Sequence, residues 1–492
     1  MTDAALVYAL LAVPVGSAAL VGLMPTPRSA DRLNLATSVL TAALALALAA
    51  IALAAAPEEA AAGSWYVVDA ASGVFLALVA AIGLASAAVS PTHLRHAGRS
   101  WFSARRSHAS YYAAFNLFWA ALLALPLVDN LGLAWLLIEA TTAASAVLVA
   151  FSGSRSALEA GWKYVVLTTL GLAIALLGIV VLFVAVGGPD SGLGRLDWTA
   201  LAERAEALPA QATLFAFVLI MVGLAAKIGW APVHNWLPDA HSEAPPPVSA
   251  MLSAALLPTV LLIAWRTKLA IEPALGDGPQ QLFVGFGLVS LAIAVPFLWR
   301  PQPWKRLLAY SSLEHMGILA LGIGFGTPLA IAGVVLHVAG HGVAKALGFY
   351  TAIPLLRQDP GAAVRPPRGV ARASAPTAAA MAVSLLSLAG LPPSPLFVSE
   401  LMVLLGGMEA GLIAVSSLAA VLLALGFIGL AHALIEGLLG EKAKRGSLPS
   451  SRSARAVVLL GAGAAVALLT LTVAAYALPD SGIVEALSGS GT

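Results

Sequence analysis

The chain has 492 residues, of which 60% are hydrophobic and only 10% are charged, and its mean hydropathy is +0.92. Because roughly a quarter of the residues in a soluble domain are charged, this composition excludes a water-soluble globular protein. The sequence contains no cysteine, which excludes disulfides, iron–sulfur clusters and cysteine-ligated metals. These properties predict an all-α polytopic membrane protein.

A membrane-spanning helix needs about 20 mostly apolar residues. The first such stretch, residues 4–24, has no small-residue cleavage site after it, and we interpret it as a retained span. The longest polar connections are about 20 residues each, so no domain outside the membrane is expected; they are 91–109, 188–210, 354–373 and 436–455. About fourteen transmembrane helices are predicted, at residues 4–24, 33–55, 70–90, 110–128, 130–151, 163–187, 211–231, 247–265, 281–299, 307–325, 328–353, 374–391 running on to 408, 411–435 and 456–478.

Lysine and arginine gather in alternate loops between the expected spans. One set of loops holds twenty of the 26 basic residues, whereas the intervening loops hold only Arg195, Arg204, Arg266 and Lys268. By the positive-inside rule, this split predicts a multi-pass protein of the inner (cytoplasmic) membrane with both termini on the extracytoplasmic side. The basic set comprises Arg28, Arg32, Arg95, Arg99, Arg105, Arg106, Arg155, Lys163, Arg300, Lys305, Arg306, Arg357, Arg365, Arg368, Arg372, Lys442, Lys444, Arg445, Arg452 and Arg455.

Prolines interrupt two of the expected spans. The seventh span is broken at Pro232 and the twelfth at Pro392 and Pro393. Broken helices are tolerated in a bilayer only where protein encloses them or they line a cavity. Since the breaks are five spans apart, they predict two inverted five-helix repeats, with ordinary proline kinks as the alternative. The expected regions are 1–109 (helices 1–3), 110–270 (first repeat, helices 4–8), 271–440 (second repeat, helices 9–13) and 441–492 (helix 14 and a short tail).

Lys227 and Glu139 are ionisable side chains deep inside expected spans. Lys227 follows a long apolar run in span 7, and Glu139, in the middle of span 5, is its natural partner. A charge at mid-membrane costs roughly 3 kcal/mol or more, so such residues are functional candidates. The alternative is a buried pair that only fixes helix packing.

Span 11 carries a polar stripe. His337, His341 and Lys345 recur every four residues, which places them on one helical face. Imidazoles and a buried amine can exchange protons near neutral pH, and Glu400 in the second half of span 12 adds a carboxylate. The sequence thus favours a proton relay along this face, and packing alone explains three such groups poorly.

Other ionisable residues have simpler explanations. Glu314 and His315 lie near the cytoplasmic end of span 10, where an interfacial role explains them as well as a relay does. His432 fits a packed or interfacial residue.

A second constellation lies in the connector after span 7. It contains the zinc-ligand types His234, Asp239, His241 and Glu243, but not the paired histidines of an H-E-x-x-H helix. Nearby prolines favour a tight connector instead. No phosphate loop, nucleophile elbow or haem-attachment motif occurs, so we expect no metal and no cofactor in this chain.

Four stretches carry recognisable motifs, at 130–142, 227–250, 305–317 and His337-x3-His341-x3-Lys345. They resemble the motifs of the antiporter-like proton-channel subunits of respiratory complex I, a family that includes Mrp antiporters and energy-converting membrane hydrogenases. The resemblance covers about residues 70–440, and the sequences His-Ser-Glu-Ala-Pro and Ser-Ser-Leu-Glu-His-Met-Gly are most similar to the F component of the hydrogenase-4 branch. The family implies fourteen helices with inverted repeats.

The resemblance also implies roles for individual residues. Glu139 matches the span-5 glutamate that tunes the span-7 lysine, here Lys227. The His-His-Lys stripe matches the span-11 relay, and Glu400 matches the ionisable residue of broken span 12. The chain ends soon after Leu478, so we expect it to lack the long lateral helix of the most distal complex I subunit.

The sequence departs from the family in two places. In span 8, Ser253 and Pro258 stand where relatives carry His or Lys, and before span 10 Pro303 stands where many relatives carry Asp. The link from Lys227 to span 11 is therefore expected to run through water, organised by Ser253 and Thr259, or to be weak.

The leading hypothesis is a proton-translocating subunit of a bacterial or archaeal energy-converting oxidoreductase complex, in which partner membrane subunits carry the electrons. The partners expected are these subunits, the lipid bilayer and protons or Na⁺, without nucleic acid. The rivals are a cation/proton antiporter subunit of Mrp type and a structural membrane scaffold. Neighbouring genes discriminate them, since hydrogenase or quinone-reductase subunits favour the first hypothesis and small antiporter subunits favour the second.

Overall fold

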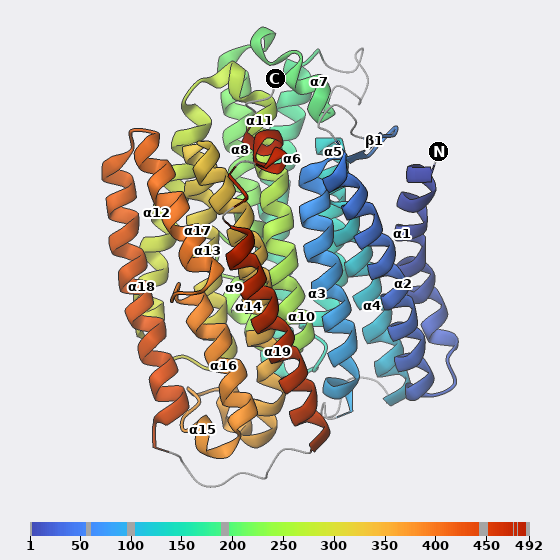
Figure 1. The fold of residues 1–492 in the computed structure, drawn as a ribbon. Helices are drawn as coiled ribbons and strands as arrows, with labels where there is room; N and C mark the ends of the chain where they lie inside the picture. The colour runs from blue at the N-terminus through green and yellow to red at the C-terminus, as the bar shows by residue number, and fades with distance from the viewer. Residues whose placement is uncertain are drawn as a thin grey trace.

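The computed structural model is almost entirely helical (Figure 1). It describes residues 2–55, 61–95, 104–187, 196–441, 451–475, 477–479 and 481–488. The basic residues Arg99, Arg195, Lys442, Lys444 and Arg445 of the expected loops lie outside these ranges.

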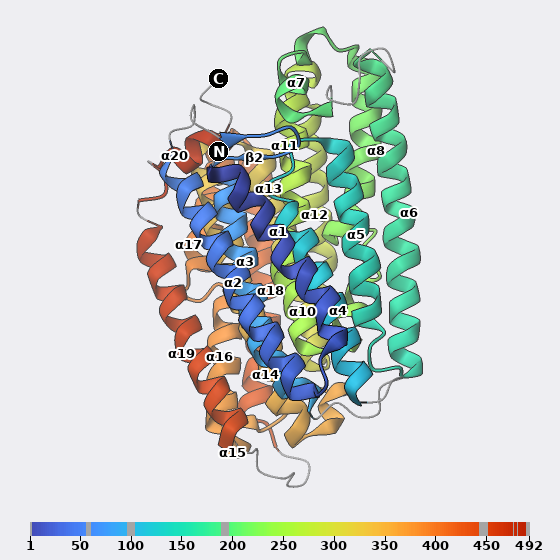
Figure 2. The same cartoon turned by 90° about the vertical axis from the view of Figure 1, so that its right-hand side faces the viewer.

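The helices run side by side as one bundle (Figures 1 and 2). Eleven helices in the described ranges are long and apolar enough to cross a membrane, which confirms the predicted polytopic helical fold. The elements are α1 (Thr2–Leu20), η1 (Val21–Leu23), α2 (Pro27–Ala54), β1 (Ala61–Ala62), β2 (Val67–Val68), α3 (Ala70–Leu94), α4 (Ala104–Ala124), α5 (Leu131–Val149), α6 (Arg155–Ala185), α7 (Trp198–Ala202), η5 (Ala205–Ala207), α8 (Ala210–Ile228), α9 (Leu237–Glu243), α10 (Pro246–Met251), η6 (Leu252–Leu256), α11 (Leu257–Leu275), α12 (Gly278–Trp299), α13 (Trp304–Phe325), α14 (Pro328–Gln358), η7 (Pro360–Ala363), α15 (Val370–Ala373), α16 (Ala375–Leu388), α17 (Pro395–Glu409), α18 (Ile413–Leu439), α19 (Ser451–Ala474) and α20 (Gly482–Ser488).

The first and last helices that the structure describes lie toward the same end of the bundle. The start of α1, together with α7 and α20, lies at one end, and α15 lies at the other (Figure 2). An even number of crossings, such as the fourteen expected, produces this arrangement; the number of crossings and the side of the membrane on which each end lies stay predictions.

Helix α13 and the α10–α11 stretch form the buried centre of the bundle, and other helices surround them. In α13 and in the α10–α11 stretch, every residue of the most apolar segment is buried inside the protein. In α12 and α18, only 33% and 28% of the corresponding segment is buried. Large apolar side chains such as Leu170, Phe215 and Val421 are exposed on outer helices. Because lipid solvates apolar groups and penalises charges, this arrangement keeps the ionisable residues of the central helices inside protein.

Both predicted helix breaks are present. The first lies between α8 and α9, where Gly229 has φ +83°, and the second lies between α16 and α17, where Gly390 has φ +66°. Each left-handed glycine stands three residues before a proline, Pro232 or Pro393. Freed backbone groups find partners nearby, since Ala231 N donates to Ser290 Oγ (3.0 Å).

A π-helical turn, η6, interrupts the helix that follows the first break. It ends two residues before Pro258, whose ring removes a backbone donor from the α-helical pattern. Wider turns of this kind are frequent at functional sites, and this one contains Ser253.

Helices α6 and α8 pack glycine against glycine. A Cβ atom at Gly223 would lie 2.5 Å from the Ala175 backbone nitrogen, and it would also collide with the Gly171 carbonyl. Lys227 lies one turn after Gly223, so this close approach sets the position of its amine.

We expect Gly223→Val to force the two helices apart and to destabilise the protein by about 1–3 kcal/mol, the usual cost of overpacking. The measurement is the thermal unfolding midpoint of the purified protein in detergent. Gly285→Val in α12 is the matched control, because nothing lies within 4 Å of a Cβ atom at that position. Equal loss of stability in both variants would contradict the proposed packing.

Candidate functional site

The first ionisable centre surrounds Lys227, the penultimate residue of α8, directly before the helix break. Its side chain is completely buried. The amine donates hydrogen bonds to Thr142 Oγ1 (2.7 Å) and Tyr164 OH (2.5 Å), and it lies 4.5 Å from the centroid of the Tyr164 ring. The Tyr164 hydroxyl is also within 2.8 Å of Ser145 Oγ. Hydroxyls from α5 and α6 therefore solvate this amine in place of water.

Glu139 acts on Lys227 without touching it. The two side chains interact electrostatically, but the described residues contain no salt bridge between them. Glu139 Oε1 instead accepts a hydrogen bond from Thr169 Oγ1 (2.9 Å). The direct partners of the lysine are thus neutral, and the expected partnership is a longer-range one.

The second ionisable centre, which we call the histidine centre, comprises Glu314, His315, His337, His341, Lys345 and Glu400. The predicted stripe of His337, His341 and Lys345 on α14 is completely buried. His315 from α13 lies against it, with its ring centroid 5.1 Å from those of both histidines, which are themselves 6.4 Å apart. His315 therefore lies close to both His337 and His341, whose rings are farther from each other along α14.

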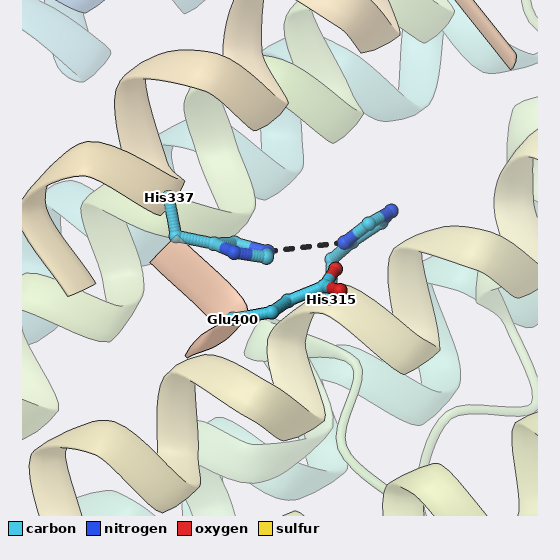
Figure 3. Close-up of side chains that lie close together, drawn as sticks. All are labelled: His315, His337 and Glu400. Atoms are coloured by element: carbon cyan, nitrogen blue, oxygen red, sulfur yellow. Dashed lines mark hydrogen bonds between the residues drawn. The ribbon is translucent and has the colours of Figure 1, made fainter. Parts of the chain in front are cut away.

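Hydrogen bonds fix the rings of His315 and His337. His315 Nδ1 lies 3.0 Å from His337 Nε2 (Figure 3), and His337 Nδ1 lies 2.9 Å from Ser399 Oγ. Ser399 stands on α17, directly before Glu400. The chain of contacts therefore connects α13, α14 and the second half of the broken helix.

Two glycines seat the carboxylates of this centre. A Cβ atom at Gly390, in the second break, would lie 2.6 Å from Glu400 Oε2. A Cβ atom at Gly426 on α18 would collide with Glu314 Oε1. The two glutamates interact electrostatically with each other, and Glu314 also interacts with Lys345.

Lys345 is held by α13. Its amine donates to the Leu308 carbonyl (2.6 Å) and to Ser311 Oγ. Glu314 and His315 are also buried, with exposed fractions of 4% and 1%. The interfacial explanation for these two residues is therefore wrong, because α13 is enclosed along its length.

The region between the centres contains His241 from α9. It is completely buried, and its Nδ1 lies 2.8 Å from the Leu237 carbonyl, so this nitrogen carries the proton. Its Nε2 has no hydrogen-bond partner among the described residues. His241 interacts electrostatically with Lys345 and His341. An imidazole with an open acceptor thus lies next to the histidine centre.

Ser253 and Thr259 are expected from the sequence to organise water between Lys227 and α14, and their hydroxyls make different hydrogen bonds. Ser253 Oγ lies 2.8 Å from Ser312 Oγ and so connects η6 to α13. Thr259 Oγ1 donates to the Ala255 carbonyl of its own helix (2.6 Å). Ser253 is therefore connected to α13, whereas the hydroxyl proton of Thr259 is used within its own helix.

The residues of the rejected zinc constellation have separate partners. Asp239 pairs with Lys163 (3.4 Å) and Arg306 (3.0 Å), and Glu243 accepts a hydrogen bond from Ser156 (2.9 Å). In the described part of the chain, the clustered metal-ligand types are instead His315, His337 and Glu400.

The structure thus brings the six predicted site residues into two groups. Glu139 lies near Lys227, while His337, His341, Lys345 and Glu400 share the histidine centre. The sequence left Glu314 and His315 open between a relay and an interfacial role, and it suggested His241 only as a zinc-ligand type in the connector. The neighbouring serines and the apolar run after His315 were signals that α13 is enclosed.

Comparisons with known proteins identify the family of this chain. Residues 128–427 match the family described as NADH:quinone oxidoreductase/Mrp antiporter, TM. The hydrogenase-4 component F homolog of Methylacidiphilum infernorum is 34% identical, over 76% of this chain and 78% of that protein. NADH-quinone oxidoreductase subunit N of Desulforudis audaxviator is 31% identical, over 71% and 70% respectively.

Solved structures share the fold. A chain of the archaeal membrane-bound sulfane sulfur reductase aligns with TM-score 0.82 at 20% identity, covering 98% of this chain and 97% of that one. A chain of the Mrp complex from Dietzia sp. aligns with TM-score 0.78 at 20% identity, covering 99% of both. A chain of Thermus thermophilus respiratory complex I aligns with TM-score 0.75 at 23% identity, covering 96% and 98%. With the matched family covering more than half of its length, this chain belongs to the NADH:quinone oxidoreductase/Mrp antiporter transmembrane family.

Proposed function

We propose that this chain translocates protons as a membrane subunit of an energy-converting oxidoreductase complex. The main support is that buried ionisable groups lie at both helix breaks, with polar side chains between them. The relatives named as hydrogenase-4 component F and quinone oxidoreductase subunit N favour such a complex, in which partner subunits carry the electrons. The alternative is a cation/proton antiporter subunit of Mrp type, to which the fold is equally similar.

The proposed membrane location, topology and internal repeats of the chain are based on its sequence. The chain lies in the inner membrane with both termini outside the cytoplasm, and residues 110–270 and 271–440 form two inverted repeats. The matching glycine and proline positions at the two breaks support the repeats. Each repeat then contributes one ionisable centre.

Lys227 is the proposed proton carrier of the first repeat. Thr142 and Tyr164 hold its amine, and the negative charge of Glu139 favours the protonated form from a distance. Since the two residues share no hydrogen bond, a change of charge at Glu139 alters the proton affinity of the lysine without breaking a contact. Electrostatic signals from partner subunits can act in the same way.

His241 and Ser253 are the proposed link between the repeats. The open Nε2 of His241 can accept a proton, and this residue lies within electrostatic reach of Lys345 and His341. Tyr164 packs against Trp236 (ring centroids 4.8 Å apart), and Trp236 packs against His241 (6.0 Å). A histidine on the broken helix thus replaces the titratable group that span 8 lacks.

The histidine centre carries the proton to the second break. Each neutral imidazole has one donor and one acceptor, so a proton added at one end of the His315–His337 pair is released at the other as both rings change tautomer. Neither ring nitrogen of His341 has a hydrogen-bond partner among the described residues, so an ordered water is proposed to join it to the chain. Glu400 is the proposed exit group.

Glu139→Gln should slow proton pumping while leaving assembly intact, because it removes the charge that favours the protonated lysine. Lys227→Ala should slow pumping further, by about tenfold or more, equivalent to roughly 1.4 kcal/mol of barrier. The measurement is proton uptake coupled to electron transfer in proteoliposomes containing the whole complex. Glu159→Gln is the control, since that carboxylate is 57% exposed and, among the described residues, forms an ion pair with Lys163 on the same helix. Pumping at the parent rate by Lys227→Ala would refute the role of this centre.

The double variant His337→Ala/Lys345→Ala should uncouple electron transfer from pumping, because both groups lie on the proposed path. The protons pumped per electron are measured in the assembled complex. His432→Ala, on an exposed histidine of α18, should keep the parent ratio. An unchanged ratio in the double variant would show that protons take another route.

His241→Gln tests the link between the repeats. The amide keeps the size and polarity of the side chain but cannot be protonated, so pumping should fall about tenfold. The pumping ratio and the amount of assembled complex are measured together. His234→Gln is the matched control in the same connector. If both variants pump equally well, the link does not pass through His241.

A further inference from the structure

His315, His337 and Glu400 form a compact set of metal-ligand types in the interior of the protein. Each offers one ligand atom, and these atoms all lie within 4.8 Å of one another (Figure 3). The two histidines are almost completely buried, and Glu400 is partly exposed. The three residues come from three different helices, α13, α14 and α17.

The distances come close to those of a tetrahedral zinc site. Zn–N and Zn–O bonds of about 2.0–2.2 Å separate neighbouring ligand atoms by about 3.3–3.5 Å. His315 Nδ1 and His337 Nε2 are already 3.0 Å apart. To reach that separation, the two ring nitrogens need to move apart by a few tenths of an ångström. Rotation of the Glu400 carboxylate then brings one of its oxygens closer to both nitrogens.

His337 also has the support that a metal-bound imidazole needs. Metal ligands of this type use the second ring nitrogen to hydrogen-bond a neighbouring oxygen, which fixes the tautomer and the ring orientation. His337 Nδ1 faces Ser399 Oγ (2.9 Å), which in turn donates to the Leu396 carbonyl (2.8 Å). The backbone of Leu388 faces His315. The nitrogens that face each other share one hydrogen bond, and they become the metal ligands when an incoming ion displaces that proton to solvent.

The local charge suits a divalent cation. Glu400 contributes a carboxylate to the site and Glu314 lies within electrostatic range of it, while the amine of Lys345 acts on both histidines and on Glu314. Gly390 lets the Glu400 carboxylate approach the break closely, which keeps it beside the histidines. A cation here would be compensated within the protein, as burial requires.

We propose that His315, His337 and Glu400 bind a divalent transition metal of the zinc type, with a fourth position left for water. Two histidines and one glutamate are a ligand set that proteins use for zinc. The bound ion occupies the lone pairs through which the imidazoles accept protons. Zinc is therefore a reversible blocker at this position. The site itself is independent of the proposed proton transport, since binding requires only the ligands.

The test uses the complete complex, purified from membranes, freed of metal with a chelator and exposed to Zn²⁺. We expect one tightly bound zinc per copy of this chain, with an X-ray absorption spectrum of two imidazoles and a carboxylate. His315→Gln, His337→Gln and Glu400→Gln should each weaken binding at least tenfold. Ser399→Ala, which removes only the support of His337, should weaken it by about 10–100-fold.

His341→Gln and His432→Gln are the controls. The first alters a buried histidine 5.1 Å from the His315 ring that is not among the three ligands, and the second alters an exposed one. Both variants should keep the zinc. Equal loss in His341→Gln, or a parent spectrum without imidazole, would overturn the assignment. If zinc binds but pumping ignores His337, only the transport proposal fails; if pumping needs His337 but zinc does not bind, only the metal site fails.

Discussion

The cost of placing charge in lipid governs the whole structure. An ionisable group at mid-membrane costs roughly 3 kcal/mol or more unless protein surrounds it. The chain meets this requirement by enclosing α13 and the α10–α11 stretch completely and by giving exposed apolar side chains to the outer helices. Lys227, Lys345 and His337 can then be present because hydroxyls and backbone carbonyls hydrogen-bond to them inside the protein.

Breaks in the helices supply what regular helices cannot. A continuous helix uses its own carbonyls and amides, so it offers no backbone groups to a buried ion or side chain. At the two breaks, glycines with left-handed backbone end the helices next to Lys227 and Glu400. The ionisable groups therefore lie where the backbone is least uniform and where small changes in position need not disrupt a long helix.

Much of this arrangement could be predicted from the sequence. Apolar length located the helices, prolines located the breaks, and a spacing of four placed His337, His341 and Lys345 on one buried face. Such patterns describe one helix at a time. They do not say which helix faces the stripe, so the bridging position of His315 could not be predicted. Likewise, Thr142 and Tyr164 surround Lys227 because α5 and α6 pack there, and this kept Glu139 from direct contact.

The contact between Glu314 and Gly426 has a mechanical consequence. Helix α18 is among the most exposed of the bundle, whereas Glu314 belongs to the enclosed α13. With no side chain on Gly426, the carboxylate rests directly on the backbone of α18, and no flexible group lies between them to absorb movement. Any sliding or tilting of this outer helix against a neighbouring subunit or the lipid is therefore passed on directly to an acidic group in the interior.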